Sequence, residues 1–97
     1  MKNITKSEIV KLTKRLIKIE STKDKPDNLL NVLNIAKEYL KGFKIEEFEN
    51  NGVKSLLVYN TSTRPDRFRV VLNAHLDVVI ANDNQYIPKV ITNRLYG

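Results

Sequence analysis

The stretch Phe68–Val79, with the sequence FRVVLNAHLDVV, decides the fold that we expect for this chain. Its first part, Phe68–Ala74, is apolar and rich in valine, which predicts a buried β-strand. His75, the only histidine in the chain, follows this strand, and Asp77 comes two residues later. In extended backbone, both side chains of a His-x-Asp sequence point to the same side, so one can bind a metal while the other holds the imidazole. Because α/β proteins present ligands and catalysts at strand ends, His75 and Asp77 form the candidate functional site.

Two helices are predicted ahead of the strands. Residues 5–8 have the pattern of a capping box, in which Thr5 is the N-cap and Glu8 is the third helical residue. Apolar residues at spacings of three and four then predict a first helix over about 6–20. After a polar break, a second apolar stripe predicts a helix over about 27–41, with Gly42 as its C-terminal cap.

After the helices the sequence takes on the character of β-strands. Residues 43–49 and 54–60 predict two strands, and Asn50-Asn51-Gly52 predicts the tight turn of an antiparallel hairpin between them. Residues 68–74 predict a third strand, which could lie parallel or antiparallel to either of the first two. Residues 90–96 predict a further short hairpin, bent at its middle. The expected class is therefore α/β, with two N-terminal helices packed on a short mixed β-sheet.

Composition limits the kind of protein that this can be. A chain of 97 residues, 41% hydrophobic and 29% charged, makes at most one small globular domain. It has no cysteine, which excludes disulfides and thiolate metal sites. No apolar run approaches the roughly 20 residues needed to span a bilayer, and no apolar signal-peptide core follows residues 1–6. We therefore expect a soluble, cytoplasmic protein with no membrane partner.

The net charge of +6 leaves a second class of function open. Residues 1–25 hold eight Lys or Arg and three Asp or Glu, a local balance of 8 − 3 = +5, and Arg64, Arg67 and Arg69 flank a loop. Such residues could bind an acidic partner or nucleic acid, and His75 would then be an ordinary residue. However, the basic residues of the first helix lie opposite its apolar stripe, which is typical of a solvated face. We expect no nucleic-acid partner and keep a small basic binding module as the alternative.

Three segments of the chain resemble a known family. Residues 73–79 (NAHLDVV), followed by a loop and then by residues 94–97 (RLYG), resemble the start of the M20 metallopeptidase family. Residues 16–21 (LIKIES) also resemble the family's L-x-x-I-x-S segment. The family includes acetylornithine deacetylase-, succinyl-diaminopimelate desuccinylase- and carboxypeptidase G2-like enzymes. The resemblance implies a zinc-dependent peptidase or deacylase that hydrolyses an amide bond of small peptides or N-acyl amino acids.

The resemblance also implies roles for two residues. His75 would be a ligand of one of two zinc ions, and Asp77 would be the catalytic-site carboxylate that orients its imidazole. The metals would lower the pKa of a bridging water and polarise the scissile carbonyl, while a glutamate takes the proton. In the family, the bridging aspartate, the Glu-Glu pair, the other ligands and the dimerisation domain come later in the sequence. Ile80 stands where a proline is common, which leaves the path of the following loop open.

We therefore expect residues 1–97 to be the N-terminal part of such a catalytic domain, without the dimerisation domain. A catalytic zinc site needs about three protein ligands, so we expect the chain alone to be inactive and to hold zinc weakly or not at all. Glu46 and Glu47 do not supply the missing pair, because adjacent residues of a strand face opposite ways. A partial domain exposes strand edges, which invite pairing with another chain. We therefore expect self-association into dimers or larger assemblies.

Overall fold

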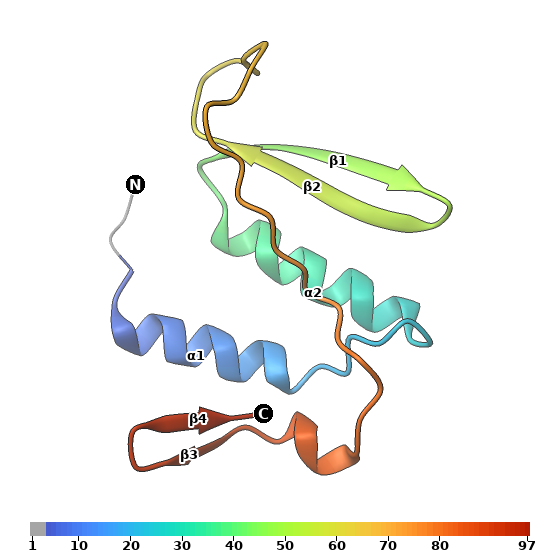
Figure 1. Ribbon diagram of the computed structural model, residues 1–97, viewed down its shortest axis with the longest axis vertical. Coiled ribbons are helices and arrows are strands. Elements are labelled where there is room, and N and C mark those ends of the chain that lie inside the picture. The colour runs from blue at the N-terminus through green and yellow to red at the C-terminus, as the bar shows by residue number, and fades with distance from the viewer. Residues whose placement is uncertain (1–3) are drawn as a thin grey trace. The chain divides into compact units, whose positions relative to one another are not determined.

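A computed structural model describes residues 4–97 of the chain. Within these residues it has two α-helices, four short strands and a 3-10 helix (Figure 1), in the order α1 (Lys6–Ile17), α2 (Pro26–Tyr39), β1 (Lys44–Asn50), β2 (Val53–Tyr59), the 3-10 helix (Asp83–Tyr86), β3 (Lys89–Ile91) and β4 (Arg94–Tyr96). The α/β class predicted from the sequence is thus confirmed. The chain divides into two compact units. Unit 1 holds the residues up to Val32 together with Leu76–Gly97, and unit 2 holds Leu33–His75.

Both helices form where the apolar stripes predicted them. The Thr5 hydroxyl accepts a hydrogen bond from the Glu8 amide at 3.2 Å, and the Glu8 carboxylate accepts one from the Thr5 amide at 3.1 Å, which confirms the capping box. Helix α1 ends at Ile17, three residues earlier than predicted, and α2 ends at Tyr39, two residues earlier. Gly42 follows α2 with φ +102°, a conformation that glycine adopts without strain. Neither helix in residues 4–97 is long and apolar enough to cross a membrane.

The most buried apolar side chains belong to α2. Val32 lies in unit 1 and Ile35 in unit 2, and both are almost fully buried. Helix α1, by contrast, has no fully buried residue, so its apolar stripe is only partly covered. Each unit therefore has a thin core, as expected from the length of the chain.

The two predicted hairpins are confirmed. Strands β1 and β2 pair antiparallel from Lys44↔Tyr59 to Asn50↔Val53. Their turn places Asn51 at φ 52° and Gly52 at φ 80°, the positive values that a two-residue hairpin turn of this kind requires. Strands β3 and β4 also pair antiparallel, with Thr92 at φ 58° in the turn between them.

The prediction of a buried third strand over residues 68–74 is wrong. This segment is drawn as coil in Figure 1, and Val70, Val71 and Leu72 are largely exposed. The predicted single mixed sheet is also wrong, because the structure has two separate two-stranded antiparallel sheets. The physical reason is that a strand needs another backbone to pair with. The turn at Asn51 and Gly52 gives β1 and β2 such a partner, whereas no strand among residues 4–97 pairs with 68–74.

Candidate functional site

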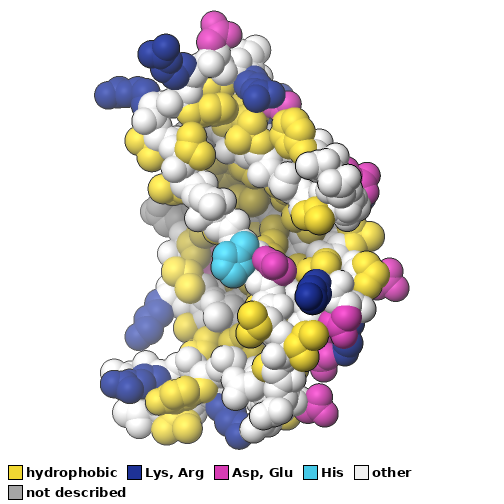
Figure 2. Space-filling view, turned by 45° about the vertical axis from the view of Figure 1, so that its right-hand side comes forward, with side chains coloured by type: hydrophobic (Ala, Val, Ile, Leu, Met, Phe, Trp, Pro, Cys, Tyr) yellow, Lys and Arg dark blue, Asp and Glu magenta, His cyan; other side chains and the backbone are white. Residues whose placement is uncertain are grey.

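The two predicted site residues belong to different units of the chain. His75 is the last residue of unit 2, and Asp77 is the second residue of the segment that returns to unit 1. Both side chains are exposed, and Figure 2 shows the histidine, coloured cyan, at the molecular surface. Their solvent access suits a ligand-binding role. The pairing of the Asp77 carboxylate with the His75 imidazole stays a prediction from the sequence.

The backbone around Asp77 is held by Ser21, which comes shortly after α1. The Ser21 hydroxyl donates a hydrogen bond to the Leu76 carbonyl at 2.8 Å. The Val78 amide donates in turn to the Ser21 carbonyl at 2.9 Å. Ser21 is only 2% exposed. Sequence reasoning noticed Ser21 as the end of the L-x-x-I-x-S segment but gave it no role, because nothing in the local sequence connects it with residues 55 positions away.

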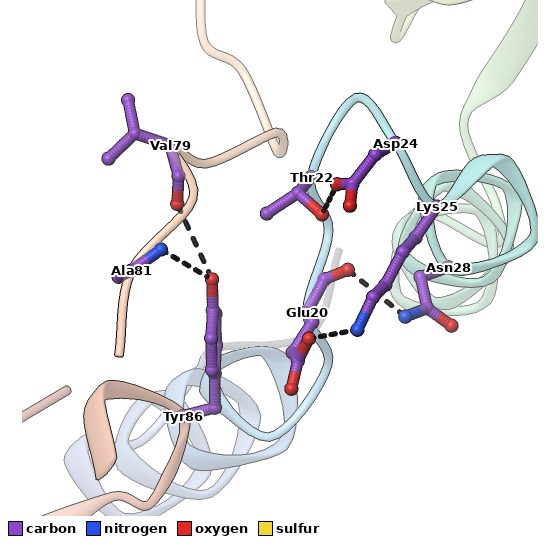
Figure 3. Close-up of polar contacts among 8 residues, drawn as sticks. All are labelled: Glu20, Thr22, Asp24, Lys25, Asn28, Val79, Ala81 and Tyr86. Atoms are coloured by element: carbon purple, nitrogen blue, oxygen red, sulfur yellow. Dashed lines mark hydrogen bonds and ion pairs between the residues drawn. The ribbon is translucent and has the colours of Figure 1, made fainter. Parts of the chain in front are cut away.

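The loop after Val79 is held by Tyr86. Its hydroxyl accepts a hydrogen bond from the Ala81 amide at 3.2 Å and lies 3.4 Å from the Val79 carbonyl, to which it donates (Figure 3). Tyr86 is the last residue of the 3-10 helix, which brings its ring back toward the preceding loop. These contacts give the path of the loop around Ile80, which the sequence left open.

The loop that carries Ser21 has its own polar network (Figure 3). The Asn28 side-chain amide donates to the Glu20 carbonyl at 3.0 Å, and the Lys25 ammonium pairs with the Glu20 carboxylate. The hydrogen bond to Glu20 raises the pKa of Lys25. The hydroxyl of Thr22, which is 2% exposed, donates a hydrogen bond to the Asp24 carboxylate, and this bond lowers the pKa of Asp24. Together these contacts order the loop on both sides of Ser21.

The two adjacent glutamates of β1 have different partners. The Glu46 carboxylate accepts a hydrogen bond from the Tyr59 hydroxyl at 2.9 Å and pairs with Arg64 at 3.4 Å. Glu47 instead pairs with Lys37 of α2 at 3.0 Å. That these glutamates do not act as a catalytic pair stays a prediction from the sequence. Partial burial raises the pKa of Tyr59, and the hydrogen bond to Glu46 raises it further.

The acidic and histidine side chains do not make a complete metal centre. Among residues 4–97, no three His, Cys, Asp or Glu side chains come close enough together to hold a metal ion. A catalytic zinc ion needs about three protein ligands. The described part of the chain therefore offers His75 as one candidate ligand and does not fit a complete zinc site.

The end of the RLYG segment lies beside the end of α1 in unit 1. A Cβ atom added to Gly97 would stand 2.5 Å from Cδ1 of Ile17, which is too close for any real contact. The structure thus brings two of the segments that carry the family resemblance together, residues 16–21 and 94–97.

Comparison with known proteins relates the chain to a class of hydrolase. No protein-family model matches the chain. Over 71 residues, which make up 73% of the chain, it is 34% identical to a succinyl-diaminopimelate desuccinylase from Nautilia profundicola. The aligned part is 18% of that enzyme, so the chain spans about a fifth of the length of this curated relative. This similarity supports the M20 resemblance and gives no support to the binding-module alternative.

Proposed function

We propose that this chain forms the N-terminal part of a zinc-dependent M20-type hydrolase that cleaves an amide bond. The observation that carries the proposal is the 34% identity over 71 residues to a succinyl-diaminopimelate desuccinylase. The His75-x-Asp77 sequence agrees with it, because it places a metal-binding side chain and a carboxylate two residues apart. The exposure of both side chains keeps them accessible to a metal and to a substrate.

In this proposal His75 supplies one ligand to a zinc ion, and Asp77 orients its imidazole. Zinc, when bound, activates a water molecule and polarises the amide carbonyl. The other ligands and the general base come from parts of the whole enzyme outside these 97 residues. Because residues 4–97 do not gather a ligand set, we derive no hydrolytic step for this chain alone and propose that it is inactive by itself.

The proposed substrate class is an N-acyl amino acid or a small peptide. The name of the relative makes an N-succinyl amino acid the first substrate to assay with the whole protein. Hydrolysis by the whole protein should be lost in the His75→Ala variant, because a catalytic zinc ion has only about three protein ligands and the variant removes one of them. We propose a soluble, cytoplasmic setting for this reaction.

The role of His75 can be tested on the 97-residue chain by zinc titration. Isothermal calorimetry should show no submicromolar binding, because one histidine is far from a complete site. At millimolar zinc, NMR shifts should centre on the imidazole of His75, and they should disappear in His75→Ala. Asp77→Asn should weaken this binding several-fold, because the carboxylate that orients a ligand contributes to its affinity.

Two outcomes of this titration would contradict the proposal. Submicromolar binding that depends on His75 would show that the chain holds a complete site. The absence of any His75 shift at millimolar zinc would contradict the expected weak binding by the chain alone, while the role of His75 as a ligand in the whole enzyme is tested by the loss of hydrolysis in His75→Ala. Glu47→Gln is the matched control, since it also neutralises one carboxylate, and it should leave the zinc-induced shifts unchanged because Glu47 is paired with Lys37.

A further inference from the structure

We infer that Ser21 is a positioning residue for Asp77. It fixes the backbone on both sides of Asp77 and thereby directs the carboxylate. The inference rests on the proposed function for the role of Asp77 itself. It assigns a role to Ser21, for which the family resemblance implied none. It is carried by two hydrogen bonds, by the burial of Ser21 and by the network around it, all within unit 1.

The two hydrogen bonds of Ser21 fix the peptide planes that flank Asp77. The Leu76 carbonyl belongs to the peptide group before Asp77, and the Val78 amide belongs to the peptide group after it. Since peptide groups are planar, φ and ψ of Asp77 are the only soft rotations between these two planes. Ser21 binds the first plane through its hydroxyl and the second through its carbonyl. One residue therefore sets φ and ψ of Asp77, and with them the direction of its Cα–Cβ bond.

Burial makes these hydrogen bonds consequential. Ser21 is 2% exposed, so water cannot readily replace its hydroxyl as the donor to the Leu76 carbonyl. The hydrogen bond to the Leu76 carbonyl is itself part-buried, so a carbonyl that loses this donor is only partly compensated by water. Ser21 is itself held in place, because its amide donates to the Ile19 carbonyl at 2.8 Å and Asn28 binds the neighbouring Glu20 carbonyl.

The anchoring continues beyond Asp77. The Tyr86 hydroxyl binds the Val79 carbonyl and the Ala81 amide, directly after the groups bound by Ser21. Backbone groups from Leu76 to Ala81 are thus held by two side-chain hydroxyls that both belong to unit 1. A segment held at successive peptide groups can present the Asp77 carboxylate in one direction, although its own side chain is exposed.

Thr22 provides a matched control for Ser21. It is the next residue, it is equally buried at 2% exposure, and it also carries a hydroxyl. Its hydroxyl, however, donates to Asp24 within the same loop. Thr22→Val therefore removes a buried hydroxyl from the same loop without removing a hydrogen bond to the segment around Asp77.

The experiment compares Ser21→Ala, Ser21→Thr, Thr22→Val and Asp77→Asn in the 97-residue chain by two NMR measurements. Hydrogen exchange of the Val78 amide reports the anchoring of the backbone. The tautomer ratio of the neutral His75 imidazole reports the position of the Asp77 carboxylate, and the single histidine gives a single set of signals. Ser21→Ala keeps the backbone carbonyl that binds the Val78 amide but loses the neighbouring hydrogen bond to the Leu76 carbonyl. Because this loss loosens the same segment, it should speed Val78 exchange by up to about tenfold. Ser21→Ala should also shift the tautomer ratio of His75 in the same direction as Asp77→Asn does. Thr22→Val should change neither the exchange rate nor the tautomer ratio. Ser21→Thr, which keeps the hydroxyl, should give the wild-type value of both.

The outcomes separate this inference from the proposed function. If Asp77→Asn shifts the tautomer ratio and Ser21→Ala does not, the inference is overturned while the role of Asp77 stands. If Ser21→Ala speeds Val78 exchange but neither variant shifts the ratio, Asp77 does not orient His75 and the positioning role falls with it. Should Ser21→Ala unfold the chain, the scalar coupling across the hydrogen bond between the Val78 nitrogen and the Ser21 carbonyl carbon decides in the wild type. A measurable coupling supports the inference, and its absence overturns it.

Discussion

Two stretches of unit 2 are both predicted to form β-strands, but only one of them does. Residues 44–59 form a hairpin in which every residue of β1 has a partner in β2. Residues 68–74 are at least as rich in valine and leucine, yet they form no strand and leave Leu72 92% exposed. The difference lies in the availability of a partner. The hairpin closes over the two residues Asn51 and Gly52, so its second strand is always within reach, and short loops cost little entropy to close.

The second stretch, residues 68–74, has contacts near both of its ends. The ring of Phe68 lies against that of Tyr59 with 5.9 Å between centroids, in the tilted geometry that aromatic pairs favour. After His75, the chain is held in unit 1 through the hydrogen bonds of Ser21. Between these points the residues have high β-propensity, but their backbone pairs with no strand among residues 4–97. The comparison teaches that propensity alone does not make a strand, because the backbone groups must also be paired.

The largest effect on the stability of the chain should come from a substitution in the turn of the hairpin between β1 and β2. Gly52 has φ 80°, and a Cβ atom placed there would meet nothing within 4 Å. The Cβ atom of Gly52→Val therefore meets no clash, and the left-handed backbone conformation costs this variant about 1–2 kcal/mol of stability. Urea denaturation should show this loss, and hydrogen exchange should place it in β1 and β2. Asn51→Gly, which keeps a residue that tolerates positive φ, should stay close to the wild type. A Gly52→Val chain of unchanged stability would show that the turn does not limit the hairpin.

A smaller effect on stability, with a clear effect on association, should come from the unpaired stretch. We propose that residues 68–74 pair with a second copy of the chain, because their exposed side chains are apolar and their backbone pairs with no strand among residues 4–97. Leu72→Lys should abolish this association in light scattering while changing stability by no more than about 0.5 kcal/mol, as is usual for surface positions. Val53→Lys adds the same charge at a position that is 70% exposed but already paired in β2, so it should leave association intact. A wild-type chain that stays monomeric at high concentration would contradict the proposal.

The smallest effect on stability should come from Tyr59, whose ring lies against Phe68 and so joins the two stretches. Partial burial and then the hydrogen bond to Glu46 raise the pKa of Tyr59 above its ordinary value of 10.0. The folded state therefore favours the protonated phenol, so this contribution to stability is complete below pH 10 and is lost as the pH rises through the raised pKa. Glu46→Gln should lower the pKa of Tyr59 in an ultraviolet titration, with Tyr59→Phe identifying its signal. Glu47→Gln, on the residue that pairs with Lys37, should not change it.

Much of the local structure could be predicted from the sequence. The capping box at Thr5 and Glu8, the turn at Asn51 and Gly52 and the short hairpin of β3 and β4 all depend on residues close together in the chain. The strand at 68–74 could not be predicted correctly, because its formation depends on a partner and not on its own composition. The candidate site was predicted as His75 and Asp77, but the role of Ser21 was missed because its hydrogen bonds join residues 55 positions apart.

The sequence by itself determined the α/β class, the two helices, the two hairpins and the His75-x-Asp77 segment as the candidate site. These features follow from spacing, capping and turn residues, whose effects act over a few positions. Only the tertiary structure decided that residues 68–74 pair with no strand among residues 4–97, and that Ser21 and Tyr86 hold the backbone around Asp77. The physical reason is that hydrogen-bond partners far apart in the chain are chosen by packing, which no local pattern encodes.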